Sequence, residues 1–167
     1  MDKIYAPWRD SYVAQVTGDK NKFTDDKCVF CEIFKQKNDE QNFVLRRTAD
    51  TVTVLNLYPY NAGHLMVLPL DHKAQLSDLP LDVRSLIMEE TNLAVEIIKV
   101  VFKPEAFNIG INMGKVSGGG IPTHMHVHIV PRWNGDANFI AVIFDTKPIS
   151  FDLKDIYKKL KEEFDKY

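Results

Sequence analysis

Three histidines occupy alternate positions in the segment HMHVHIVPRW, residues 124–133. They are His124, His126 and His128, and an apolar residue follows each of them. Successive side chains of a β-strand point to opposite faces of the sheet. The segment therefore predicts a strand with three neighbouring imidazoles on one face and a row of apolar side chains on the other.

A row of three imidazoles can support two kinds of chemistry. Three histidines can bind one zinc ion, and the water on that ion then attacks the substrate. Alternatively, one neutral imidazole attacks phosphorus as a nucleophile, while an acceptor holds its other ring nitrogen. A polar sheet face without any such chemistry is the plain alternative, although exposed strand positions usually favour threonine or other residues over histidine.

A glycine-rich segment, SGGGIPT at residues 117–123, directly precedes the histidines. Glycine lacks a Cβ, so that the backbone N–H groups of such a segment can come close to an anion. A flexible connector would have the same composition. The position of the segment next to three imidazoles favours a phosphate group held beside one of them.

The two cysteines form a CxxC pair, Cys28 and Cys31. In a reducing compartment such a pair is either a redox dithiol or half of a metal site, and a structural disulfide is not expected. Both alternatives remain open on the cysteines alone.

Length and composition narrow the classes of protein. A chain of 167 residues with 45% hydrophobic and 26% charged residues suits one folded domain. The net charge of −2 argues against a general nucleic-acid binder. There is no apolar run of the ~18 residues that a membrane helix needs, and no apolar signal core near the start. We therefore expect a cytoplasmic protein without nucleic-acid or membrane partners.

The apolar patterning predicts an α+β fold with a mostly antiparallel sheet, because the connections between most strands are too short for parallel crossovers. A long helix is expected from about Leu81 to Phe102, just before Pro104, and a C-terminal helix over residues 152–167. Residues 1–25 are expected to form an N-terminal extension. Strands are expected at residues 43–47, 51–55, 64–70, 106–114, 124–133 and 138–144.

Two segments together resemble the histidine triad (HIT) superfamily of nucleotidyl hydrolases and transferases. The segment HMHVHIV (residues 124–130) fits the signature of that family, and NLYPYNAGHLMVLPLDH (residues 56–72) is similar to its upstream stretch. The resemblance covers roughly residues 28–140. IYAPWRDSYV and VPRWNGDANF are similar to a zinc-containing bacterial branch that includes diadenosine tetraphosphate phosphorylases. It implies a single HIT domain over residues 1–167, with a five-stranded sheet, one long helix and a C-terminal helix.

The resemblance also implies catalytic roles. His126 would attack the α-phosphorus and form a covalent nucleotidyl-imidazole intermediate, which splits one displacement into two. His128 would orient and polarise His126, and His64 would stand beside the phosphate. A buried core histidine is the plain alternative for His64.

Nucleotide-binding residues follow from the same resemblance. Asn56 would bind the ribose hydroxyls, although an asparagine there could equally be a turn residue. Asn112 and the backbone N–H groups near Gly119 and Gly120 would contact the phosphate. Many family members carry a polar residue where this chain has Gly120, so that help for the leaving group must come from another group, such as His64.

The family resemblance further implies a structural zinc ion and no organic cofactor. The matching zinc ligands are Cys28, Cys31, His72 and His124, which complete a tetrahedral Cys2His2 set with no open position.

The expected function is cleavage of an adenine nucleotide or a dinucleoside polyphosphate at the α-phosphate, in a homodimer. A three-histidine zinc hydrolase and a non-catalytic nucleotide-binding module on the same fold are the alternatives. Trp133 could line the nucleoside pocket, a subunit contact or the core.

Overall fold

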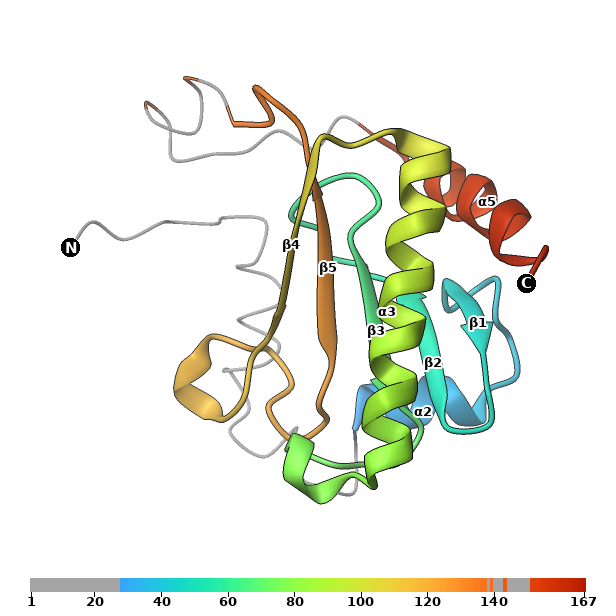
Figure 1. Cartoon of the computed structure of the whole chain (residues 1–167), viewed down its shortest axis with the longest axis vertical. Coiled ribbons are helices and arrows are strands. Elements are labelled where there is room, and N and C mark those ends of the chain that lie inside the picture. Colours follow the sequence, from blue (N-terminus) through green and yellow to red (C-terminus); the bar gives the residue numbers. More distant parts are fainter. Residues whose placement is uncertain (1–27, 138, 140–142, 144–150) are drawn as a thin grey trace.

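The computed structural model describes residues 28–137, 139, 143 and 151–167. The expected N-terminal extension, with its segment IYAPWRDSYV, lies outside these residues. Five strands form one antiparallel sheet in the order β1-β2-β3-β5-β4 (Figure 1). They are β1 (Val44–Arg47), β2 (Thr51–Leu55), β3 (Leu65–Pro69), β4 (Ala106–Ile111) and β5 (Val127–Arg132). The α+β fold with a five-stranded antiparallel sheet is therefore confirmed.

Three helices accompany the sheet: α2 (Val29–Lys35), α3 (Leu81–Phe102) and α5 (Leu153–Phe164). Two single turns of 3-10 helix, η3 (Leu76–Asp78) and η4 (Lys115–Ser117), lie in the connections. The long helix α3 has the bounds that the apolar periodicity predicts. It ends at Lys103, which adopts the left-handed conformation before Pro104. The C-terminal helix begins after Asp152, whose side chain accepts hydrogen bonds from two backbone N–H groups.

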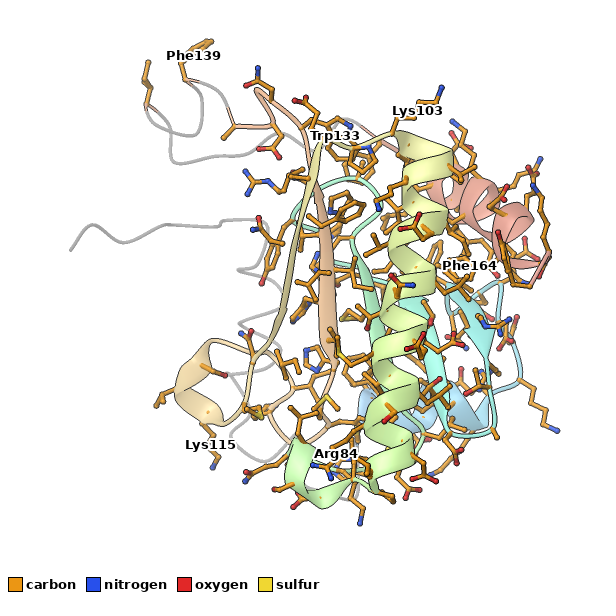
Figure 2. All side chains as sticks on the ribbon, viewed as in Figure 1. Arg84, Lys103, Lys115, Trp133, Phe139 and Phe164 are labelled. Atoms are coloured by element: carbon orange, nitrogen blue, oxygen red, sulfur yellow. The ribbon has the colours of Figure 1, made fainter. Side chains whose placement is uncertain are left out.

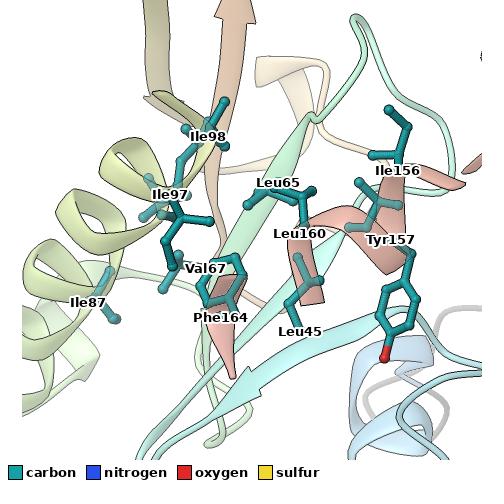
Figure 3. Packing of buried hydrophobic residues seen from close by; sticks show 14 of the residues in the cluster. Leu45, Leu65, Val67, Ile87, Ile97, Ile98, Ile156, Tyr157, Leu160 and Phe164 are labelled. Carbon is teal, nitrogen blue, oxygen red and sulfur yellow. The ribbon is translucent and has the colours of Figure 1, made fainter. Parts of the chain in front are cut away.

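The two faces of the sheet pack against different helices. On one face, α3 and α5 form a core with alternate residues of the strands (Figure 3). In this core Ile97 and Ile98 of α3 belong to the same cluster as Leu65 and Val67 of β3. On the other face, α2 covers a smaller cluster that includes Val54 and Met66. The central strands β2 and β3 are therefore buried throughout.

The histidine segment keeps its alternation, but its strand begins later than expected. β5 starts at Val127 rather than at residue 124, because the N–H of Met125 donates to the carbonyl of Lys73 (2.7 Å) and the pairing with β3 ends at Val127. Met125, Val127 and Ile129 belong to the core beneath α3. The three histidines accordingly face the side of the sheet that carries α2.

The strand expected at residues 138–144 lies mostly outside the described residues. Its two described positions, Phe139 and Ile143, are helical, so the prediction of a strand is wrong at both. Short apolar runs suit a buried helical turn as well as a strand, and apolar character alone does not separate the two. Within the described parts of the chain, no helix combines the length and the apolar character that a bilayer crossing requires.

The core position of α5 gives a test of the fold. Leu160 of α5 is completely buried, with Phe164 of the same helix close to α3 (Figures 2 and 3). Leu160→Ala should lower the free energy of unfolding by about 3 kcal/mol, because it removes transfer free energy and leaves a cavity. Urea denaturation measures this change. Lys158→Ala, an exposed position on the same helix, should stay within about 0.5 kcal/mol of the parent, and an equal loss in both variants would contradict this packing.

Candidate active site

Three of the histidines form a continuous row of rings on the α2 side of the sheet. His126 precedes β5, His128 lies on β5, and His64 directly precedes β3 on the neighbouring strand. The ring centroids of His126 and His128 are 4.7 Å apart, and those of His64 and His128 are 5.1 Å apart. The sequence prediction that these three side chains lie together is therefore met by the geometry.

The backbone determines which nitrogen of His126 carries a proton. Nδ1 of His126 lies 2.9 Å from the carbonyl oxygen of His124. Because a carbonyl oxygen can only accept, Nδ1 donates and Nε2 of the neutral ring carries the lone pair. Burial lowers the pKa of His126, so that this neutral form is the main one at neutral pH.

A backbone N–H also orders the protons on His64 and His128. The N–H of Tyr60 donates to Nδ1 of His64 (3.1 Å), which places the proton of the neutral His64 ring on Nε2. That Nε2–H donates to Nδ1 of His128 (3.0 Å). The neutral His128 ring then carries its own proton on Nε2. The relay thus ends in a second N–H donor beside His126.

Burial keeps His64 uncharged. Its side chain is completely buried, and burial, together with the neighbouring His128 and His126, lowers the pKa of His64 to about 3. An uncharged ring can donate through one nitrogen and accept through the other, as the relay requires. The plain reading of His64 as a buried core histidine holds for its burial, but its two ring nitrogens are both engaged in the row.

A pocket opens beside His126 and His128, with about 860 Å³ of empty space, part of it open to solvent. Val29, Phe30 and Ile33 of α2 form one wall, and the glycines of residues 118–120 form part of the rim. Asn56 also lines it. The Asn56 side chain accepts a hydrogen bond from the N–H of Tyr58 (2.9 Å), as a turn residue does, while its Nδ2 lies near the His64 ring.

The glycine-rich loop reaches the pocket and Asn112 supports it from behind. Gly119 and Gly120 line the same pocket as His126. A Cβ on Gly119 would lie 3.1 Å from Cβ of Asn112, so the close approach favours glycine there. Asn112 donates to the carbonyl of Ser117 (2.9 Å) and lines a neighbouring hollow with His128 and Arg132, rather than the pocket of His126.

Trp133 does not line the pocket beside His126. It is half-buried and lies beyond the end of β5, far from Lys115 and the glycine-rich loop (Figure 2). The sequence prediction that it could line the nucleoside pocket finds no support within one chain.

The remaining two histidines meet the two cysteines. One potential ligand atom from each of Cys28, Cys31, His72 and His124 lies within 4.8 Å of the others. Nδ1 of His124 is 3.4 Å from Sγ of Cys28 and 3.5 Å from Sγ of Cys31, and Nδ1 of His72 is 3.4 Å from Sγ of Cys31. A tetrahedral zinc ion with ordinary bond lengths holds sulfur and nitrogen ligands about 3.5 Å apart.

The hydrogen bond on the far side of His124 suits a metal ligand. Nε2 of His124 donates to the carbonyl of Pro69 (2.9 Å), so the lone pair of Nδ1 faces the two thiols. Burial, with the neighbouring Cys28, raises the pKa of Cys31 to about 11, so that without a cation both sulfurs would stay thiols. The four residues therefore fit a structural Cys2His2 ion. Among the described residues, this set contains His124 but neither His126 nor His128.

Sequence reasoning missed the contribution of α2. Phe30 packs against the rings of both His124 and His126, with centroids 5.5 and 5.4 Å away. The signal was present, because apolar residues recur at helical spacing through VFCEIF around the CxxC pair. The Tyr60 N–H and the Pro69 carbonyl were also missed, and backbone groups leave no mark in the residue types.

Comparison with known proteins places these residues in context. A family model described as HIT domain matches residues 37–135. The chain is 41% identical over 167 residues to a protein of Mycobacterium tuberculosis named AP-4-A phosphorylase, which covers 98% of this chain and 85% of that protein. It is 28% identical to an adenosine 5′-monophosphoramidase of Candida albicans, over 83% of this chain and 92% of the relative.

The fold has the same relationship. A crystal structure of a zinc-bound histidine triad family protein from Mycobacterium smegmatis superimposes with a TM-score of 0.69 at 23% identity, over 86% of this chain and 96% of the other. The match to the family model, the extended identity to a named relative and the shared fold lead to one assignment. The chain belongs to the HIT domain family.

Proposed function

We propose that this protein is an enzyme that cleaves dinucleoside polyphosphates at the α-phosphate through a covalent nucleotidyl-His126 intermediate. The observation that carries the proposal is the hydrogen bond from Nδ1 of His126 to the carbonyl of His124, which leaves the lone pair on Nε2 in a buried, uncharged ring. A neutral imidazole with a fixed lone pair is the state that attacks phosphorus.

The reaction proceeds in two displacements. Nε2 of His126 attacks the α-phosphorus, a P–N bond forms, and the P–O bond to the remaining nucleotide breaks with its electron pair on the departing oxygen. Water or inorganic phosphate then attacks the same phosphorus, and the P–N bond breaks with its electron pair returned to Nε2. A step that uses two moderate barriers replaces one high barrier.

The relay from Tyr60 through His64 supplies the second group. The N–H on Nε2 of His128 stands beside His126 and can donate to a phosphoryl oxygen as charge develops there. This donor compensates for Gly120, where many relatives of this family would carry a polar side chain. Backbone N–H groups at Gly119 and Gly120, on the pocket rim, would bind the phosphate, and Asn112 would act by supporting their loop.

The substrate is proposed to be an adenine dinucleotide. The relative named AP-4-A phosphorylase matches almost the whole chain, and the pocket beside His126 has a size suited to one nucleoside. Asn56, which lines this pocket, is proposed to bind the ribose hydroxyls.

A structural zinc ion is proposed at Cys28, Cys31, His72 and His124, supported by the distances among their ligand atoms and by the relative whose structure is described as zinc-bound. It would tie α2 to the sheet. The alternative of a zinc ion on the three alternate histidines is disfavoured, because Nδ1 of His124 faces thiols while Nδ1 of His126 faces a carbonyl.

A homodimer in the cytoplasm completes the proposal. β4 is an edge strand with mostly exposed side chains, and exposed apolar residues on this strand and on α3 include Ile109, Met88 and Val100. Such surfaces are typical of contacts between subunits. The free cysteines suit a reducing compartment.

The role of His126 is tested by substitution and trapping. His126→Gly should lower kcat/KM for diadenosine tetraphosphate by on the order of 10⁴-fold or more, because no other group replaces a covalent nucleophile. Intact-mass spectrometry of the rapidly quenched parent enzyme should show an added adenylyl group that is absent from His126→Gly. Normal turnover in His126→Gly would show that the nucleophile lies elsewhere.

The acceptor is identified by the products. With inorganic phosphate present, diadenosine tetraphosphate should give ADP and ATP, because phosphate attacks the adenylyl-His126 intermediate. Chromatography of reactions with and without phosphate separates these products from AMP and ATP. ADP that appears only with phosphate indicates a phosphorylase, whereas AMP under both conditions contradicts phosphorolysis and indicates a hydrolase.

Metal content tests the cysteine cluster. The purified parent should contain about one zinc ion per chain, and Cys31→Ser should lose it and melt about 5 °C lower or more, because a Cys2His2 ion contributes directly to folding. Elemental analysis and thermal melting measure these changes. His126→Gly is the matched control and should keep its zinc. Loss of zinc from His126→Gly with retention in Cys31→Ser would favour the three-histidine site.

A further inference from the structure

One amide lies in the part of the pocket that is otherwise lined by apolar side chains. Asn42, from the turn before β1, lines the same pocket as Val29 and Ile33 of α2 and Val54 of β2. A polar side chain in such a wall is informative, because a ligand that fills the pocket removes water from it and then has to satisfy its hydrogen-bonding groups.

The order of the strands places Asn42 far from the nucleophile. The pocket runs across the sheet from His126 and His128, at β5, past Met66 of β3 and Val54 of β2, to Asn42 beside β1. Neighbouring strands lie about 4.8 Å apart, so this path crosses three such spacings. With the α-phosphate at His126 and the ribose at Asn56, the base of a nucleotide is the part that reaches the apolar end.

The backbone holds Asn42 in a fixed position. The next residue, Phe43, has a φ of 54°, a left-handed conformation that is uncommon for an aromatic residue, and its ring packs against Tyr157 at 5.5 Å between centroids. The N–H of Asn42 donates to the carbonyl of Asn38 (3.1 Å). A constrained backbone of this kind is often found next to a binding group.

The hydrogen bonds of the Asn42 amide give it a direction. Its Nδ2 donates to Oε1 of Gln36, the residue at the end of α2, over 3.2 Å. Its Oδ1 accepts no hydrogen bond from any described residue. The pocket therefore offers an acceptor at its apolar end, and an acceptor discriminates between an amino group and a carbonyl on a nucleobase.

We propose that Asn42 is a specificity-determining residue, which accepts a hydrogen bond from the exocyclic amino group of adenine through Oδ1. The inference rests on the proposed function for the position of the nucleotide, and it adds the group that reads the base. Gln36 is the positioning residue, because it engages Nδ2 and so turns the oxygen of the amide toward the pocket.

Calorimetric titration with AMP and IMP tests the proposal, because the two nucleotides differ by the replacement of the 6-amino group by a 6-oxo group. The parent should bind AMP about tenfold more tightly than IMP, which is the effect of one hydrogen bond. Asn42→Leu should bind the two nucleotides equally. Asn42→Asp, which keeps an acceptor, should retain the preference for AMP.

Gln41→Leu is the matched control, since Gln41 is an exposed residue of the same turn and does not line the pocket. It should show the parent's preference for AMP. Equal binding of AMP and IMP by the parent, or a preference for AMP that survives in Asn42→Leu, would overturn the role of Asn42. A parent that binds neither nucleotide would overturn it as well.

Adenylylation of His126 by diadenosine tetraphosphate, measured on the same proteins, separates this inference from the proposed function. Adenylylation without discrimination between AMP and IMP leaves the proposed function intact and removes the role of Asn42. Discrimination that depends on Asn42, without adenylylation, has the opposite meaning: the base is read as proposed, and the covalent mechanism is wrong.

Discussion

The alternation of side chains along residues 124–129 is the constraint on which both the core and the site depend. Met125, Val127 and Ile129 are almost completely buried beneath α3, and this packing fixes the face to which the intervening histidines point. A shift of one residue would bring imidazoles into the core and apolar side chains into the pocket. The position of His126 is therefore determined by the side chains on the opposite face of the sheet, and stability and chemistry are linked in one short segment.

Main-chain groups then decide what each imidazole can do. The carbonyl of His124 gives His126 a lone pair on Nε2, the carbonyl of Pro69 turns the lone pair of His124 toward the thiols, and the N–H of Tyr60 sets the proton order in His64 and His128. A carbonyl never donates and a peptide N–H never accepts, whatever the pH. Five histidines of one type thus acquire different roles through backbone contacts that substitution of a side chain does not remove.

Apolar periodicity in the sequence is enough to predict α3 with its bounds and the five strands within a few residues, because these elements are long or regular and bury one face. The residues of the site are also foreseeable, since histidines, cysteines and glycines stand out by type. What the sequence does not contain is the set of contacts between distant segments. The helix α2 has only seven residues, β5 begins where Met125 bonds Lys73 instead of a strand, and Asn42 has no distinguishing mark. Each of these depends on where another segment lies.

Helix α2 unites the parts of the site that the sequence separates. Cys28 precedes it and Cys31 lies within it, so the cluster with His72 and His124 attaches the helix to the sheet at one point. Phe30 packs against His126, and Val29 and Ile33 line the pocket. A helix of this length is not stable by itself in water. Its attachment must therefore come from the cluster and from the apolar residues beneath it, so that the wall of the pocket and the metal ligands form one unit. A closed ligand set with no open position can serve the site in this way without taking part in the displacement at phosphorus.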